Sequence, residues 1–278
     1  MIDIIIPVYN TPLKDLERCL NSIYKQPFKE YIAYIIDDGS NEETKDFLDN
    51  YIKNKDNFIV KHIKNNGVSN ARNYGINISN NKYITFVDSD DTITENFLKE
   101  AYEIIEKYDL DLVIGGYNEI KNNQIAKVRL SLPGIHIYEN DTIINFFEKL
   151  LSGKTNDTNR EINNCPTGRI YTRIFKRNSI NKLRFNTCIH MSEDTLFMID
   201  YTKQANKIGI VDKVWYNYHI NEYSISNGTK KEQLITNIEE FIQEIIIRYN
   251  NEDNIRLKNA YKERINKAKN YIETLKKL

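Results

Sequence analysis

The stretch Tyr83–Thr92, "YITFVDSDDT", joins a short apolar β-type run to three carboxylates, Asp88, Asp90 and Asp91. Like charges this close repel one another, so the cluster requires a compensating positive partner. Mg²⁺ and Mn²⁺ prefer oxygen ligands and are often held by one or two carboxylates together with a substrate's phosphates. The stretch therefore favours a divalent-cation site, while a turn that starts a helix stays open as the alternative, because Asp and Ser are common cap residues.

Similar apolar runs alternate with helical patterns on both sides of this stretch. The runs cover residues 2–8, 31–36, 58–63, 83–87 and 111–116, and a helical pattern follows each of the first four. Thr11 followed by Pro12 predicts the start of the first helix, and Asn41 or Ser40 is expected to cap the second. Strands that alternate with helices predict βαβ units, and hence an α/β fold whose mostly parallel sheet has helices on both faces.

Ligands bind beyond the carboxyl ends of the strands in sheets of this kind. Polar or aromatic residues follow the strands at those points: Tyr9–Asn10, Asp37–Asp38, Asn66–Gly67 and residues 88–91. Residues 118–168 are less regular, with 154–168 as their most polar part, and strand and helix signals return from 169 to 218. After Gly228 the chain is almost entirely helical in pattern.

Composition and missing motifs exclude several classes of protein. The chain has 39 basic and 39 acidic residues, so no overall field attracts nucleic acid. Cys19, Cys165 and Cys188 form no CxxC pair, which argues against zinc and against a disulfide framework. The first βα turn contains no glycine, and the P-loop-like "SGKT" at 152–155 has Glu148 where the upstream glycine is needed. With no signal-peptide pattern and no apolar run of membrane-spanning length, we expect a soluble cytoplasmic protein.

Five motifs, taken together, resemble family 2 glycosyltransferases of the GT-A fold. They are "IIIPVYN" (4–10), "IIDDGS" (35–40), "NNGVSNARNYGI" (65–76), "YITFVDSDD" (83–91) and "MSEDTLF" (191–197), in the family's order. The resemblance implies a Rossmann-like sheet and a metal-assisted, inverting transfer of sugar from a nucleotide donor. It also implies Mn²⁺ or Mg²⁺ as cofactor, and a glycan or lipid-linked acceptor used in cell-surface polysaccharide synthesis.

The resemblance assigns roles to residues that match its motifs. The residues expected to bind the nucleotide or donor sugar are Pro7, Tyr9, Asn10, Asp37, Asp38, Arg72, Asn73, Asp88 and Ser89. Among them Tyr9 is similar to the aromatic that packs on the base. Asp38, beside Asp37, is similar to the acceptor of the uracil imide, which favours a UDP-sugar because a carboxylate only accepts hydrogen bonds. Asp88 is placed near the ribose, and Asp90 on the cation that bridges the diphosphate.

The catalytic base is expected in a second motif. Glu193 and Asp194 resemble the family's acidic pair, with Asp194 as the base that takes the acceptor's proton. His219 is a further candidate for contact with the diphosphate or the metal. Plainer readings stay open for each feature: Ser192 as a helix cap before the acidic pair, Tyr9 as a core aromatic, residues 37–39 as an ordinary turn, Arg72 as a paired surface cation, and His219 as a surface residue.

The resemblance also sets expected domain limits. A catalytic domain is predicted over residues 1–227, with a nucleotide-binding half at 1–117 and an acceptor-binding half at 118–227, followed by a helical extension at 228–278. Residues 255–278 hold eight basic and two acidic side chains, a net charge of +6, beside an apolar stripe at helical spacing. Packing on the catalytic domain, self-association and peripheral contact with the inner membrane face all fit that helix.

Two rival functions use the same fold. A nucleotidyltransferase that makes sugar nucleotides would need a glycine-rich basic loop, which "PVYNTPLKD" at 7–15 does not supply. A non-catalytic binding or scaffold module would have no use for the intact carboxylates Asp88, Asp90 and Asp194.

Overall fold

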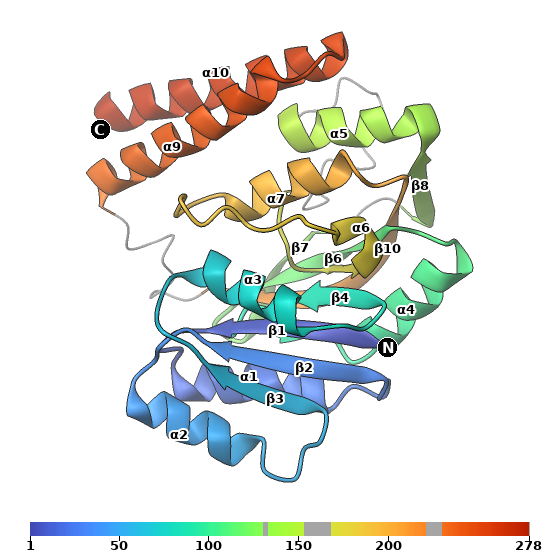
Figure 1. Cartoon of the computed structure of the whole chain (residues 1–278), viewed down its shortest axis with the longest axis vertical. Coiled ribbons are helices and arrows are strands. Elements are labelled where there is room, and N and C mark those ends of the chain that lie inside the picture. Colours follow the sequence, from blue (N-terminus) through green and yellow to red (C-terminus); the bar gives the residue numbers. More distant parts are fainter. Residues whose placement is uncertain (130–132, 153–167, 221–229, 278) are drawn as a thin grey trace.

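The computed structural model describes residues 1–129, 133–152, 168–220 and 230–277 (Figure 1). In these residues ten strands form one sheet in the order β3-β2-β1-β4-β9-β6-β10-β5, with β7 paired to β6 and β8 to β10. The strands are β1 (Ile2–Val8), β2 (Tyr31–Asp37), β3 (Phe58–His62), β4 (Tyr83–Phe86), β5 (Thr92–Ile93), β6 (Leu112–Lys121), β7 (Gln124–Arg129), β8 (Ile135–Glu139), β9 (Arg173–Lys176) and β10 (Lys207–His219). The helices are α1 (Leu13–Tyr24), α2 (Glu42–Tyr51), α3 (Val68–Ile78), α4 (Phe97–Lys107), the 3-10 turn η1 (Asn140–Thr142), α5 (Ile143–Ser152), α6 (Arg177–Ile180), α7 (Glu193–Thr202), α9 (Lys231–Asn250) and α10 (Ile255–Lys277).

The sheet is mostly parallel, as predicted, with one antiparallel strand at its centre. β3, β2, β1 and β4 pair in parallel, and β6 pairs in parallel with β10. β9 lies antiparallel between β4 and β6, so those two strands run in the same direction. β1 is buried along its whole length, which explains its unbroken apolar sequence, since a parallel strand covered on both faces has no solvent side.

Helices cover both faces of the sheet and fix the strand ends where ligands bind. α1 and α4 pack in one hydrophobic cluster, and α3, α5 and α7 pack in the other. α3 approaches β1 closely at Gly75, where a Cβ atom would lie 2.5 Å from Ile5 Cγ2. The glycine therefore allows α3, which carries Arg72, to lie directly on the central strand.

Several local expectations are settled by these elements. Asn41 caps α2 by accepting the Thr44 N–H at 2.9 Å, as predicted. Thr11 does not cap α1, which begins at Leu13 without a side-chain cap. Asp88, Asp90 and Asp91 do not cap a helix, because β5 begins at Thr92 and α4 begins at Phe97 after Asn96.

The region 118–168 is more regular than its sequence suggests. The end of β6, then β7, β8, η1 and α5 occupy it as far as Ser152. The polar run at 154–168 lies almost entirely outside the described residues, as does Cys165. β7 exposes most of its side chains, so it lacks the buried apolar face from which a strand is recognised in a sequence.

The C-terminal helices pack against the rest of the protein. α9 and α10 run side by side next to α5 and α7 (Figure 1). Tyr261 of α10 is fully buried against Phe147 of α5. Arg248 of α9 donates two hydrogen bonds to Asp200 of α7, the Nε bond being 2.8 Å long. Packing is thus the use that the structure gives to the apolar stripe, whereas self-association and membrane contact stay predictions.

We predict that Tyr261→Ala lowers the free energy of unfolding by about 3–5 kcal/mol, because it leaves a cavity where a large buried ring had packed. Urea denaturation measures the change. Tyr271→Ala on the same helix is the control, since that ring is 51% exposed, and its effect should stay near 0.5 kcal/mol. Equal effects of the two substitutions would contradict the packing of α10 on α5.

Candidate functional site

An exposed aromatic side chain stands at the carboxyl end of β1. Tyr9 is 57% exposed, whereas Pro7 and Val8 before it are buried in the strand. The reading of Tyr9 as a core aromatic is therefore wrong. Asn10 adopts a left-handed backbone conformation with φ 48°, and its side-chain oxygen accepts the Asn41 N–H at 2.9 Å. The phenol ring is free to pack on a flat ligand such as a nucleotide base.

Asp37 is the last residue of β2 and Asp38 follows it, and both carboxylates accept hydrogen bonds from backbone N–H groups. Asp38 is 3% exposed, and its two oxygens accept the N–H groups of Asn66 and Gly67 at 2.9 and 2.8 Å. Asp37 is fully buried and accepts the Ser40 N–H at 2.9 Å. Since each carboxylate oxygen has two lone pairs, Asp38 retains acceptor capacity for a base. Asp37 instead serves the turn itself, so its direct contact with the donor stays a prediction.

Arg72 joins two motifs that are distant in the sequence. Its Nη2 donates to Asp88 Oδ1 at 3.0 Å and its Nη1 donates to Glu193 Oε1 at 2.8 Å. The residue is 5% exposed, so it is not the surface cation that the alternative reading supposed. Burial opposes the charge of the guanidinium, but Asp88 and Glu193 outweigh burial and raise the pKa of Arg72 above its usual value. Without either carboxylate, the buried guanidinium would lose part of the negative charge that compensates it. The pairing therefore holds Asp88 and Glu193 next to Arg72.

Asn73 and Ser89 hold the loops rather than standing open to a ligand. The Asn73 side-chain amide donates to the Phe185 carbonyl at 2.9 Å and accepts the Phe185 N–H at 2.8 Å. The hydroxyl of Ser89 lies 2.6 Å from that of Thr11, which ties the first strand-end loop to the carboxylate loop. The donor contacts expected of Asn73 and Ser89 stay predictions.

Asp91 is the buried member of the carboxylate cluster. It is 1% exposed and accepts hydrogen bonds from the Tyr216 hydroxyl at 2.8 Å and the His219 N–H at 2.7 Å. Tyr216 in turn accepts the Asp88 N–H at 3.1 Å. Burial, with the nearby charges of Asp90 and Asp88, raises the pKa of Asp91 well above its usual value. The crowding of like charges is thus eased at Asp88 by Arg72 and at Asp91 by two hydrogen-bond donors.

His219 lies beside this cluster in a neutral form. Its Nε2 is 3.2 Å from the Thr92 hydroxyl, and its backbone binds Asp91. Burial lowers the pKa of His219 to about 4, and the charge of Arg18 acts in the same direction. At neutral pH the ring therefore carries no charge, and its contact with a diphosphate or metal stays a prediction.

The side chains of Asp88 and Asp90 fit a cation whose remaining ligands come from its substrate. Among the described residues no group of three or more His, Cys, Asp or Glu side chains is arranged to hold a metal ion alone. Mg²⁺ and similar cations are nevertheless often bound by one or two carboxylates plus substrate phosphates. Asp88 and Asp90 are both partly exposed at the strand end and supply that donor set.

Asp194 is the residue predicted to act as the general base. It lies in the first turn of α7, next to Glu193, and accepts the Thr195 N–H at 2.7 Å. Burial and the charge of Glu193 raise its pKa to about 6, although Arg72 and Arg169 oppose the change. The predicted cap Ser192 makes no side-chain cap bond, so the acidic pair is not explained by helix capping through that residue. A carboxylate poised near neutral pH can accept a proton from a bound hydroxyl.

Sequence reasoning missed three contributors to this site. Tyr216 and Arg169 come from the region after residue 168, and His62 ends β3, where the same strand-end rule would have singled it out. The Arg169 guanidinium lies 5.5 and 5.6 Å from the ring centroids of Tyr171 and Tyr218. Nothing in the sequence placed Arg169 beside these two rings.

Known proteins share this sequence pattern and this fold. GlyG of Streptococcus pneumoniae serotype 4 (strain ATCC BAA-334 / TIGR4), a glycosyltransferase, is 35% identical over 118 residues, which cover 42% of this chain and 39% of GlyG. The chain therefore spans well under half the length of that relative.

Two solved structures show the same architecture. TarS 1-349 of S. aureus in complex with UDP-GlcNAc has a TM-score of 0.68 at 22% identity, over 88% of this chain and 66% of that chain. Mannosyltransferase PcManGT from Pyrobaculum calidifontis, in complex with GDP-Man and Mn²⁺, has a TM-score of 0.60 at 12% identity, over 98% and 69%. These likenesses confirm the GT-A fold that the motifs implied.

The sequence pattern described as "Glycosyl transferase family 2" matches residues 3–184, which contain the strand ends and all three carboxylates of the opening stretch. The match extends over more than half of the chain, and the chain belongs to glycosyl transferase family 2.

Proposed function

We propose that this protein transfers a sugar from a UDP-sugar to a glycan or glycoconjugate acceptor, with inversion at the anomeric carbon. The observation that carries the proposal is Arg72, which joins Asp88 of the donor loop to Glu193, the neighbour of the candidate base. A site for leaving-group charge and a site for proton abstraction are thus held by one buried side chain. This arrangement is what a single displacement at a sugar carbon requires.

The nucleotide is expected to lie across the ends of β1, β2 and β4. Tyr9 offers an exposed ring for the base, and Asp38 offers an acceptor for the imide of uracil. The solved complex of TarS with UDP-GlcNAc supports a UDP donor, whereas that of PcManGT with GDP-Man shows that the fold also takes guanine. A carboxylate at the base position suits a base that donates an N–H, as uracil does.

The diphosphate is expected next to Asp88 and Asp90. A divalent cation bound there would stabilise the negative charge that grows on the leaving diphosphate. Mn²⁺ in PcManGT supports this cofactor. Arg72 holds the Asp88 carboxylate in place, and Tyr216 holds the Asp88 backbone, so that the loop is preorganised before the donor binds.

Asp194 is proposed to accept the proton of the attacking hydroxyl. Glu193 is fixed by Arg72 and sets the position of the first turn of α7, on which Asp194 stands. The acceptor itself is proposed to be a glycan or lipid-linked glycan of a surface polysaccharide, and residues 118–227 are proposed to be the acceptor-binding half of the sequence. The division into residues 1–227 and 228–278 is kept as part of this proposal.

The remaining alternatives fit the site less well. A nucleotidyltransferase would have to hold a triphosphate at the glycine-free turn after β1, and a scaffold module would not need a base with a pKa near 6. Among the described residues no helix is long and apolar enough to cross a membrane. Because α10 buries Leu257, Tyr261 and Ile272, membrane contact through it would depend mainly on its basic side chains.

We predict that UDP binds in the presence of Mn²⁺, and that EDTA or Asp90→Asn weakens binding at least about tenfold. EDTA removes the cation, and the substitution removes a carboxylate that holds it. Isothermal titration of UDP, GDP and CMP measures this. Asp46→Asn, a change of the same chemistry on the exposed side of α2, is the matched control and should bind like the unmodified protein. Equal UDP affinity with Mn²⁺ and with EDTA would sink the metal-assisted mechanism.

We predict that Asp194→Asn lowers sugar transfer or donor hydrolysis by about 10²–10⁴-fold and leaves UDP affinity within about twofold, because only the proton acceptor is lost. In the unmodified protein kcat/KM should fall as the pH drops below about 6, where Asp194 takes up a proton. An assay of UDP release from a panel of UDP-sugars measures both the turnover of the variant and the pH dependence of kcat/KM. Retention of full turnover by Asp194→Asn would assign the base to another residue.

A further inference from the structure

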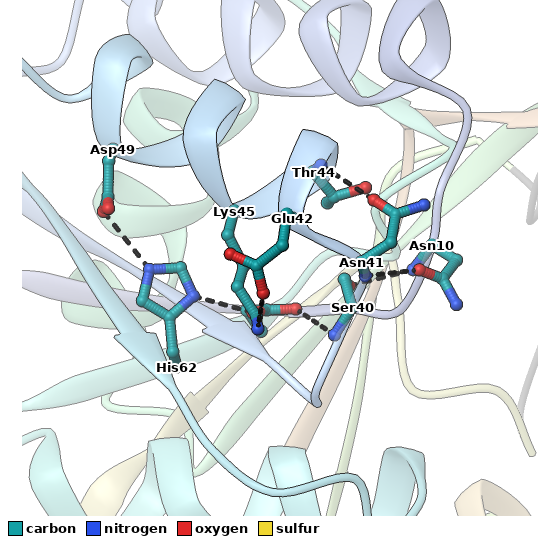
Figure 2. Close-up of polar contacts among 9 residues, drawn as sticks. Asn10, Ser40, Asn41, Glu42, Thr44, Lys45, Asp49 and His62 are labelled. Atoms are coloured by element: carbon teal, nitrogen blue, oxygen red, sulfur yellow. Dashed lines mark hydrogen bonds and ion pairs between the residues drawn. The ribbon is translucent and has the colours of Figure 1, made fainter.

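His62 ends β3 between two carboxylates (Figure 2). Its Nδ1 lies 2.7 Å from Asp37 Oδ2, and its Nε2 lies 3.2 Å from Asp49 Oδ1. A carboxylate only accepts hydrogen bonds, and neutral imidazole has a single N–H, so only the imidazolium satisfies both neighbours. The geometry therefore favours a positively charged His62.

Asp37 has no other ion-pair partner in the part of the chain that the structure describes. Its side chain is fully buried, and a buried carboxylate without a cation is costly. The further charged groups on α2 near this position are Lys45 and Glu42, and these pair with each other at 2.7 Å (Figure 2). His62 is thus the side chain that pairs with the buried Asp37 carboxylate.

A continuous set of hydrogen bonds leads from His62 to the backbone next to Tyr9, the candidate base-binding residue. Asp37 accepts the Ser40 N–H at 2.9 Å, and the Ser40 hydroxyl accepts the Asn10 N–H at 2.9 Å. The Asn10 side chain in turn accepts the Asn41 N–H at 2.9 Å (Figure 2). The backbone that carries the exposed Tyr9 ring is therefore held by a turn that Asp37 organises.

We propose that His62 is a positioning residue for the nucleotide base, acting through Asp37 and Ser40 on the backbone of Tyr9 and Asn10. The inference rests on the proposed function, because it assumes that the base of the donor packs on Tyr9. His62 touches no donor atom in this account. Its effect is to keep the two strand-end loops in one conformation before the nucleotide arrives, which lowers the entropy lost on binding.

The surroundings of His62 also give the arrangement a pH dependence. Burial lowers the pKa of its imidazole, but the hydrogen bonds and charges of Asp37 and Asp49 outweigh burial, and the pKa is raised above 6.5. The protonated form, and the stability that it contributes, are therefore complete below that value and are lost as the pH rises through the raised pKa. Asp49→Asn keeps an acceptor but removes one charge, so it should shift the loss to lower pH.

The test compares UDP affinity in two variants at fixed Mn²⁺. His62→Leu removes the donor to Asp37, and we expect UDP binding about tenfold weaker at pH 7. His62→Asn places an amide N–H near the position of Nδ1 and should restore affinity to within about twofold. The UDP affinity of the unmodified protein, divided by that of His62→Asn, should fall from about pH 6 to about pH 9 as His62 loses its proton. The two proteins share every other titrating group, and the nucleotide is the same, so these cancel in the ratio.

Amide hydrogen exchange of residues 8–12 and 38–42 supplies a measurement that needs no nucleotide. Exchange there should be faster in His62→Leu than in His62→Asn, with both proteins folded. If the unmodified protein, His62→Leu and His62→Asn all bind UDP with the same affinity, the role of His62 is overturned and the proposed function is not. Unmodified protein that binds no nucleotide would overturn the proposed function and this inference with it.

Discussion

The site depends on the buried pairing of Arg72 with Asp88 and Glu193. The two carboxylates come from different motifs, and each would repel the other acidic groups around it without the guanidinium. A planar fork with fixed N–H directions can serve two carboxylates at once, which a lysine ammonium does less well. Because α3 rests on β1 at Gly75, the position of this fork is set by the core of the sheet rather than by a mobile surface loop.

The carboxylates of the opening stretch have three different environments. Asp88 is paired to Arg72, Asp91 is buried under Tyr216 and the backbone of His219, and Asp90 is partly exposed with its carbonyl bound to Arg18 at 2.7 Å. One sequence motif thus supplies a paired charge at Asp88, a buried structural acceptor at Asp91 and, in the proposed function, the carboxylate of Asp90 as a cation ligand. This division explains how three acidic residues can occupy one turn without unfolding it.

Much of this could be predicted from the sequence, because the relevant information is local. The buried strands are continuous apolar runs, and polar residues such as Asp38 and Asp88 directly follow them, so their convergence at one sheet edge follows from parallel topology. The pairing of Arg72 with Glu193, 121 residues away, could not be predicted in this way. Neither could that of Tyr216 with Asp91, because such contacts depend on how helices pack on the finished sheet. β5, β7 and β8 were missed since short or exposed strands lack a clear apolar pattern.

The central claim is that a cation held by Asp90 bridges a uridine diphosphate at the carboxyl ends of β1, β2 and β4. A crystal structure of the protein with UDP and Mn²⁺, with the metal located by anomalous scattering, tests it most directly. We predict that an Asp90 oxygen and diphosphate oxygens would both coordinate Mn²⁺, with uracil against Tyr9 and its imide directed to Asp38. Two results would contradict this claim: a diphosphate that contacts neither Asp90 nor a metal ion held by Asp90, or a base that does not pack on Tyr9.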